Sequence, residues 1–283
     1  MNKPLIAIVA AAAFLTACCN CSEGNLQYVD PNVGGVGHIL QPTRPTVQIP
    51  NSMLRTYPWK NDQIDDQIHH FILQVTSYRV AWAWRFLPLS GEGCTHLSSH
   101  FTVENETCTP YFYSATQERT YNEVAVTPKT HSAISRIDFK SDEGPYAFNF
   151  AINGRRGEVH ADADGVVTGW DESQGLKCYI YAVTDAPVAE VLPKNEKKVS
   201  LMIADKGTYH MKYGVSYISV EQAKENLEKE IPGWDFCSVK AEAKKIWKEA
   251  MDRIQVEGGT LAQKRAFYSA FYHASERMVD INE

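Results

Sequence analysis

Acidic side chains are the first candidates for chemistry in this chain, because paired carboxyl groups can hydrolyse glycosidic bonds. An inverting glycosidase needs two carboxyls about 6.5–9.5 Å apart, one a protonated acid and the other a base that activates water. Asp62, Asp65 and Asp66 form the densest acidic cluster in the first hundred residues. Nothing nearby would desolvate one of these carboxyls, so the pattern favours a solvated turn over a catalytic pair.

Histidine and aspartate patterns give little support for a metal site. His69-His70 has no third ligand at a recognised spacing, which favours an ordinary surface pair. The run from His160 to Gly165 resembles a calcium loop, but the closing glutamate is missing at the needed spacing. We therefore expect a hairpin turn at Asp164-Gly165 and no metal ligand within the chain.

Aromatic side chains are the remaining signal for sugar binding, since a flat apolar ring complements the C–H face of a pyranose. Trp82 and Trp84 fall on one face of a predicted strand together with Phe86, which favours core packing over a sugar contact. Glu92 and His96 lie in a Gly-rich loop after that strand, where polar ligand contacts are common. These two tryptophans and two loop residues are our candidate substrate-binding residues.

Alternating side chains predict a mainly β domain. Residues 72–86 alternate with period two, which predicts one long half-buried strand. Shorter runs of the same kind, separated by turn signals, occur at residues 133–139, 146–152, 176–183, 199–204 and 211–218. With no helical pattern between them, these strands indicate an antiparallel β-sandwich rather than a parallel sheet.

A helical pattern replaces the strands after Ser219. Residues 220–231 are rich in helix formers, Ser238 is placed to cap a second helix, and Thr260 can cap a third. The apolar stripes of the last two helices have nothing later in the sequence to pack against. We therefore expect residues 239–283 to be poorly packed.

The N-terminus has the pattern of an export signal. Lys3 precedes an apolar run at residues 5–15, which is too short for a lasting membrane span. Leu15-Thr16-Ala17-Cys18 resembles a bacterial lipobox, which predicts lipidation of Cys18; a plain secretory signal cut near Ala17 is the alternative. The predicted protein is exported and lipid-anchored, on a periplasmic membrane face, the outer membrane or the cell surface.

Charge and cysteine content exclude some classes of partner. The chain has 28 Lys and Arg against 34 Asp and Glu, a net charge of −6, without a basic stripe. Nucleic acid is therefore not expected as a partner. The seven cysteines show no zinc spacing, and Cys94 and Cys108 can either form a disulfide in an exported protein or remain free thiols.

Short motifs at both ends of the chain carry a family resemblance. Near the C-terminus they are residues 214–220 (GVSYISV), 230–236 (EIPGWDF), 243–247 (AKKIW), 256–260 (VEGGT) and 267–273 (FYSAFYH). Near the N-terminus they are residues 30–34 (DPNVG) and 35–38 (GVGH). In this order and spacing they resemble glycoside hydrolase family 92, with the middle of the chain matched only in strand pattern.

The resemblance implies an exo-acting, inverting and calcium-dependent α-mannosidase, with an N-terminal β-sandwich packed on an (α/α)6 barrel. In that family the acid, the base and the calcium ligands come from the barrel, and no position here matches those motifs. We therefore assign no catalytic residue and no metal ligand. The family's sandwich also contributes to the sugar pocket through its Gly-rich loop, so His38, which matches that loop, is a further substrate-binding candidate.

The predicted organisation is a signal peptide at residues 1–17, a tether at 18–25, a β-sandwich at 26–219 and a helical linker with the start of a truncated barrel at 220–283. Our first functional hypothesis is the N-terminal portion of an α-mannosidase acting on mannose-containing glycans, inactive without a missing catalytic domain. The alternative is a free-standing glycan-binding surface lipoprotein without hydrolase activity. A structural remnant that binds no ligand is the third.

Overall fold

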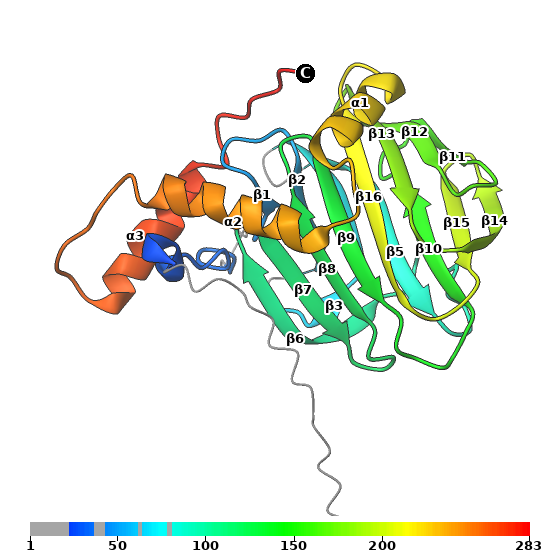
Figure 1. Ribbon diagram of the computed structural model, residues 1–283, viewed down its shortest axis with the longest axis horizontal. Coiled ribbons are helices and arrows are strands. Elements are labelled where there is room, and N and C mark those ends of the chain that lie inside the picture. Colours follow the sequence, from blue (N-terminus) through cyan, green and yellow to red (C-terminus); the bar gives the residue numbers. More distant parts are fainter. Residues whose placement is uncertain (1–22, 37–42, 62–63, 78–80) are drawn as a thin grey trace, which may run out of the picture.

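The protein is a β-sandwich with helices packed on one of its two sheets (Figure 1). The computed structural model describes residues 23–36, 43–61, 64–77 and 81–283. The predicted signal peptide, the lipobox Cys18, His38 and Asp62 lie outside the described residues. The sheet and helix content confirms the predicted fold class, a mainly β antiparallel sandwich followed by helices.

The first sheet has seven strands among the described residues, in the order β1-β2-β4-β5-β10-β15-β14. In chain order these strands are β1 (Val47–Gln48), β2 (Arg55–Trp59), β4 (His70–Ser77), β5 (Ala81–Ser90), β10 (Tyr146–Ala151), β14 (Val188–Asn195) and β15 (Lys198–Ile203). Its free edge at β14 is interrupted by two register shifts against β15 and carries Pro193.

The second sheet has nine described strands, in the order β11-β12-β13-β16-β9-β8-β7-β6-β3. They are β3 (Gln67–Ile68), β6 (Phe101–Thr109), β7 (Phe112–Gln117), β8 (Glu123–Pro128), β9 (Ser132–Asp138), β11 (Gly157–Ala161), β12 (Val167–Ser173), β13 (Leu176–Thr184) and β16 (Thr208–Ser216). The two sheets bury a common core of large apolar side chains, each at most 1% exposed: Trp84, Phe86, Phe148, Phe150 and Tyr213.

The prediction of one long strand over residues 72–86 is wrong. The structure has two strands, β4 and β5, which pair antiparallel with Phe71 opposite Phe86. Trp84 has a φ of 64°, a left-handed conformation that is rare for a bulky residue. This conformation interrupts the alternation, so Trp84 points into the core between the sheets while Trp82 packs on the opposite face of β5.

A buried carboxylate holds this irregular point of β5. Asp171 on β12 is 0% exposed, and its oxygens accept hydrogen bonds from the main-chain N–H groups of Trp84 (3.0 Å), Asn153 (2.7 Å) and Gly154 (2.8 Å). Burial raises the pKa of Asp171, and the three N–H donors and the nearby Arg85 charge oppose that rise. A Cβ at Gly154 would lie 2.6 Å from an oxygen of Asp171, so the approach requires glycine.

The helices begin and end where side-chain signals place them. Helix α1 (Val220–Glu230) starts after Ser219, whose hydroxyl accepts the N–H of Gln222. Helix α3 (Leu261–Ala274) starts with the predicted cap Thr260, which forms a capping box with Gln263. Helix α2 (Phe236–Met251) begins two residues before the predicted cap Ser238, because Asp235 accepts the Ser238 N–H and caps the helix instead.

The expectation that residues 239–283 are poorly packed is wrong, because α2 and α3 find their partners earlier in the sequence. Trp247 on α2 is 0% exposed and its indole N–H donates to the carbonyl of Gln48 on β1 (2.6 Å). Tyr268 and Tyr272 on α3 are also 0% exposed. These side chains share one apolar cluster with sheet residues and with Leu26 of the short helix η1 (Gly24–Tyr28).

Replacing Asp171 with Asn should destabilise the fold. The Asn side chain keeps one acceptor oxygen, but its NH₂ group replaces the other. That NH₂ group is a donor and faces a main-chain N–H, which is left without an acceptor. We expect the free energy of unfolding to fall by about 1–3 kcal/mol. Urea unfolding followed by tryptophan fluorescence checks this, with the exposed turn variant Asp164→Asn as control; equal midpoints for the two variants would contradict the assigned role.

Replacing Tyr272 with Phe tests how firmly α3 is held. The Tyr272 hydroxyl donates to the carbonyl of Thr46 (2.5 Å) and accepts from its hydroxyl (3.0 Å) in a fully buried place. Its removal leaves both Thr46 groups unpaired, so we expect a loss of about 1–3 kcal/mol in unfolding free energy. Tyr121→Phe, at a side chain that is 63% exposed, is the control, and an unchanged Tyr272→Phe midpoint would refute the prediction.

Candidate functional site

The structure separates the candidate substrate-binding residues instead of gathering them. Trp84 is 0% exposed, and its indole N–H donates to the carbonyl of Cys178 (3.1 Å), so the ring takes the core position that its pattern favoured. Trp82 lies on the outer face of the seven-stranded sheet. Glu92 and His96 are exposed on the loop after β5, which covers another part of the same outer face. Their roles in substrate binding stay predictions.

Trp82 belongs to a row of rings on the outer face that the sequence did not reveal. The Trp59 ring of β2 stacks parallel to His70 of β4 at 5.4 Å between centroids, and lies 6.3 Å from Trp82 of β5. Beyond Trp59, the ring of His69 lies at 5.2 Å, and His100 lies 5.3 Å from His69. We call these five side chains the aromatic row.

Strand pairing builds the aromatic row. Trp59 lies directly opposite His70 in the β2–β4 register, and Trp82 lies opposite Val75 in the β4–β5 register. On β2 the rings of Tyr57 and Trp59 alternate onto the same outer face. That short alternation was the available sequence signal. The expectation of a surface pair at His69-His70 is wrong in part, because both histidines are half-buried within the row.

Several polar atoms along the aromatic row are buried without a hydrogen-bond partner. They are the indole Nε1 of Trp59 and Trp82, Nε2 of His69 and His70, the hydroxyl of Tyr57, and Nε and Nη1 of Arg44, whose guanidinium carbon lies 6.0 Å from the Tyr57 ring centroid. Buried polar groups are nearly always hydrogen-bonded, and each one left unpaired costs about 1–3 kcal/mol. The aromatic row therefore combines flat rings with polar atoms that lack a partner.

Burial keeps two groups of this face, His70 and Tyr57, uncharged at neutral pH. Burial, together with the neighbouring Arg85 and His69, lowers the pKa of His70 to about 3. Burial raises the pKa of Tyr57 to about 12, against a smaller opposing effect of Arg44. At neutral pH a neutral imidazole and a phenol each offer one donor and one acceptor, which is the hydrogen-bonding character of a sugar hydroxyl.

A cavity of about 280 Å³ opens next to the end of the aromatic row. Its lining includes Glu92, His100, Gln117, Glu118 and Glu143. The three carboxylates are exposed, and Glu143 lies 3.8 Å from the exposed Arg119. The cavity therefore offers polar contacts rather than a desolvated pair of carboxyls.

The buried Asp171 and the described members of the acidic cluster, Asp65 and Asp66, are either already hydrogen-bonded or exposed. Asp171 is buried but its oxygens are occupied by main-chain N–H groups, while Asp65 accepts the N–H of Gln67 in a loop and Asp66 is exposed. In the part of the chain that the structure describes, no three His, Cys, Asp or Glu side chains converge on one point. These residues therefore do not fit calcium, which takes six to eight oxygen ligands.

Helix α3 holds both ends of the Gly- and Pro-rich segment near the N-terminus. The Ser269 hydroxyl accepts the Asp30 N–H (2.9 Å), and His273 Nε2 lies 3.0 Å from the Val33 carbonyl. Tyr272 binds Thr46 at the other end of the segment. The candidate His38 lies between these ends, outside the described residues.

The remaining motifs have structural roles. Asp164-Gly165 forms the predicted hairpin turn between β11 and β12, where Asp162 accepts two main-chain N–H groups. Cys94 and Cys108 are free thiols. Among the described residues no helix is both long and apolar enough to cross a bilayer.

Comparison with solved structures identifies the architecture. A family GH92 inverting mannosidase from Bacteroides thetaiotaomicron superposes with a TM-score of 0.79 at 20% identity, over 89% of this chain and 40% of that chain. A family GH92 α-mannosidase from the same organism, solved in complex with mannoimidazole, gives a TM-score of 0.76 at 16% identity, over 90% of this chain and 40% of that one. At these identities the likeness shows a shared fold, and the chain spans about two-fifths of the length of these enzymes.

Sequence comparison agrees with the fold. Residues 222–283 match the family model of the glycosyl hydrolase family 92 catalytic domain. A 65-residue stretch is 42% identical to an "Uncharacterized secreted glycosidase" of Arthroderma benhamiae, covering 22% of this chain and 8% of that protein. Residues 28–225, well over half of the chain, match the model of the glycosyl hydrolase family 92 N-terminal domain. The chain therefore belongs to glycosyl hydrolase family 92, which confirms the resemblance in its sequence motifs.

Proposed function

We propose that this chain supplies the carbohydrate-binding half of an exo-acting α-mannosidase-type glycoside hydrolase that acts on mannose-containing glycans. The observation that carries the proposal is the aromatic row, with its unpaired ring nitrogens, on a family 92 sandwich. A sugar ring can pack against the partly exposed rings of Trp59 and Trp82, as apolar ring faces complement the C–H side of a pyranose. The mannosidase neighbours support mannose as the sugar.

In this proposal the sandwich binds and does not cleave. The acid, the base and calcium would be supplied by the helical catalytic domain of the family, since the buried Asp171 is occupied by main-chain donors and the cavity carboxylates Glu92, Glu118 and Glu143 are exposed. Export by the N-terminal signal and lipid attachment at Cys18 complete the proposal. The secreted glycosidase among the relatives supports export.

A second candidate function is a free-standing glycan-binding surface lipoprotein. The packing of α2 and α3 favours it, because Trp247, Tyr268 and Tyr272 are buried in one cluster with residues of the sandwich. The two candidates share the binding face and differ in whether a catalytic domain acts on the bound glycan. Neither candidate predicts hydrolysis by this chain alone, so turnover would contradict both. Both candidates predict glycan binding, so binding measurements test both.

The purified chain of residues 1–283 should not hydrolyse an aryl α-mannoside in the presence of calcium. The physical reason is that the buried Asp171 is occupied by three main-chain N–H groups, and the carboxylates Glu92, Glu118 and Glu143 of the cavity are solvated. Release of the chromogenic aryl group checks this, with an active α-mannosidase as positive control. Turnover that disappears in the cavity variant Glu92→Gln would show that the chain carries its own catalytic site.

The chain should bind an α-linked mannose disaccharide, and the aromatic row should carry the affinity. We expect Trp82→Ala and Trp59→Ala each to weaken binding about tenfold, equivalent to about 1.4 kcal/mol. Calorimetry checks this, with Trp170→Ala on β12, in the other sheet, as matched control. Equal affinities of all three variants and the parent chain would remove the aromatic row from the site, and absence of binding by the parent chain would refute both candidate functions.

A further inference from the structure

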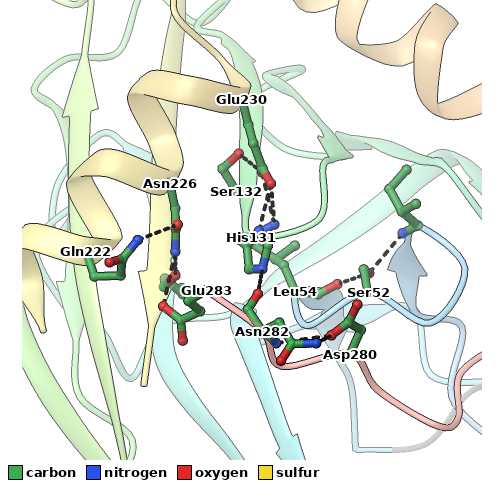
Figure 2. Close-up of polar contacts among 12 residues, drawn as sticks. Ser52, Leu54, His131, Ser132, Gln222, Asn226, Glu230, Asp280, Asn282 and Glu283 are labelled. Atoms are coloured by element: carbon green, nitrogen blue, oxygen red, sulfur yellow. Dashed lines mark hydrogen bonds and ion pairs between the residues drawn. The ribbon is translucent and has the colours of Figure 1, made fainter. Parts of the chain in front are cut away.

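His131 joins three parts of the chain that are far apart in sequence. It lies in the turn between β8 and β9, and its ring stands between the end of α1 and residues 275–283, which we call the C-terminal segment (Figure 2). Nδ1 lies 2.8 Å from a carboxylate oxygen of Glu230, and Nε2 lies 2.9 Å from the carbonyl oxygen of Asn282. The ring is thus a bridge between the sandwich, α1 and the C-terminal segment.

The bridge requires two ring protons. A carboxylate and a main-chain carbonyl are both acceptors, so each of these contacts needs an N–H on the imidazole. A neutral imidazole has only one. The doubly protonated ring of His131 satisfies both contacts, whereas the neutral ring would direct a lone pair at one of the two oxygens.

Glu230 is arranged to retain the Nδ1 proton. Its carboxylate also accepts the main-chain N–H of His131 (2.9 Å) and the hydroxyl of Ser132 (2.6 Å), so it is fixed against the turn (Figure 2). The hydrogen bond to Glu230 raises the pKa of His131 above its usual value of about 6.5. Burial opposes that rise, while the Glu230 charge, the Asn282 carbonyl and the Glu283 charge add to it.

Glu276 and Val279 anchor the first part of the C-terminal segment by burial, whereas residues 280–283 are exposed and held by polar contacts. Met278 is 86% exposed and Ile281 is 62% exposed. Besides the His131 contact, Asn51 bonds to the segment through its main chain and its side chain. The Glu283 carboxylate accepts hydrogen bonds from the Tyr217 N–H (2.8 Å) and the Asn226 side chain (3.2 Å). The His131 bond is therefore one of four polar contacts that hold the exposed residues 280–283, with the Asp280 N–H to Asn51 and the two bonds to Glu283.

The charged groups that act on the His131 imidazolium from the neighbouring elements are acidic. Glu230 comes from α1 and Glu283 from the C-terminal segment. Lys129, two residues before His131, pairs with Glu242 on α2. The proton on His131 is thus the charge that links α1 and the C-terminal segment.

We propose that His131 is a pH-sensitive latch that holds the C-terminal segment on the sandwich while its ring is protonated and releases it when the Nε2 proton is lost. The Nδ1–H stays with the Glu230 carboxylate, because a charge-assisted hydrogen bond is stronger than one to a neutral carbonyl. After deprotonation, the lone pair of Nε2 faces a lone pair of the Asn282 carbonyl oxygen, and the two repel. The hydrogen bond to Glu230 is kept, so α1 stays in place. A histidine whose pKa is higher in the folded than in the unfolded state stabilises the folded form. That stabilisation is complete below the unfolded-state pKa and is lost as the pH rises through the folded-state pKa.

The latch crosses the boundary between the two family domains. His131 lies in the N-terminal-domain match, while Glu230 and Asn282 lie in the catalytic-domain match. The segment that this proton holds is therefore part of the helical domain's sequence, placed on the sandwich. Its position relative to the sugar-binding half would change with pH without any change at the aromatic row.

Hydrogen exchange of the C-terminal segment tests the latch in the intact chain. Amide protection of residues 280–283, corrected for the intrinsic pH dependence of exchange, is measured from pH 5 to 9 beside an NMR titration of His131. We expect protection to fall about tenfold or more as His131 deprotonates, while α1 keeps its protection. His131→Gln should abolish this pH dependence, and His160→Gln should keep it, because His160 is an exposed histidine 3.5 Å from a carboxylate of its own.

A second variant keeps the test decisive if His131→Gln misfolds. Glu230→Gln removes the charge that favours the imidazolium and should move the loss of protection to lower pH. Protection that is constant across the His131 titration, or a Glu230→Gln profile identical to that of the parent chain, would overturn the proposal. Simultaneous loss of protection in α1 and the segment would equally overturn it, since the latch releases only the segment.

Discussion

The hydrogen bonds of Asp171 are the interaction on which the architecture of the binding face depends. They hold Trp84 in a left-handed conformation, so one strand sends Trp84 into the core and Trp82 to the outer face. In a regular strand both rings would share a face. The same carboxylate fixes the Asn153-Gly154 turn, where the chain passes from one sheet to the other. One buried carboxylate thus fixes both the packing of Trp84 between the sheets and the position of Trp82 on the outer face.

The helices are integral to the sandwich rather than an appendage. The apolar cluster around Trp247 includes residues from η1, β7, β8, β9 and all three α-helices. Burial of a large apolar side chain contributes about 1.5–3 kcal/mol, so this cluster is a second core. It draws on residues from both family-domain matches, 28–225 and 222–283. The division seen in sequence comparisons therefore does not correspond to two separately packed bodies in this chain.

Local features of the fold could be predicted from sequence, and non-local ones could not. The strands at β9, β10, β13, β15 and β16 and the caps Ser219 and Thr260 follow from short-range patterns. The break between β4 and β5 depends on Asp171, which lies 87 residues beyond Trp84. Likewise, the rings of Trp59 and His70 meet only because β2 pairs with β4. The apolar partners of α2 and α3 lie earlier in the sequence. The periodicity of residues 239–283 shows which faces are apolar but not what those faces contact.

The edge strand β14 has a consequence for how this protein associates with others. Its register shifts and Pro193 interrupt the regular row of N–H and C=O groups that a foreign strand needs for pairing. Lys194 and two glutamates, Glu190 and Glu196, add charge along and beside the strand. Such an edge resists the strand-by-strand growth that leads to fibrils, which matters for a sheet whose outer face carries the aromatic row.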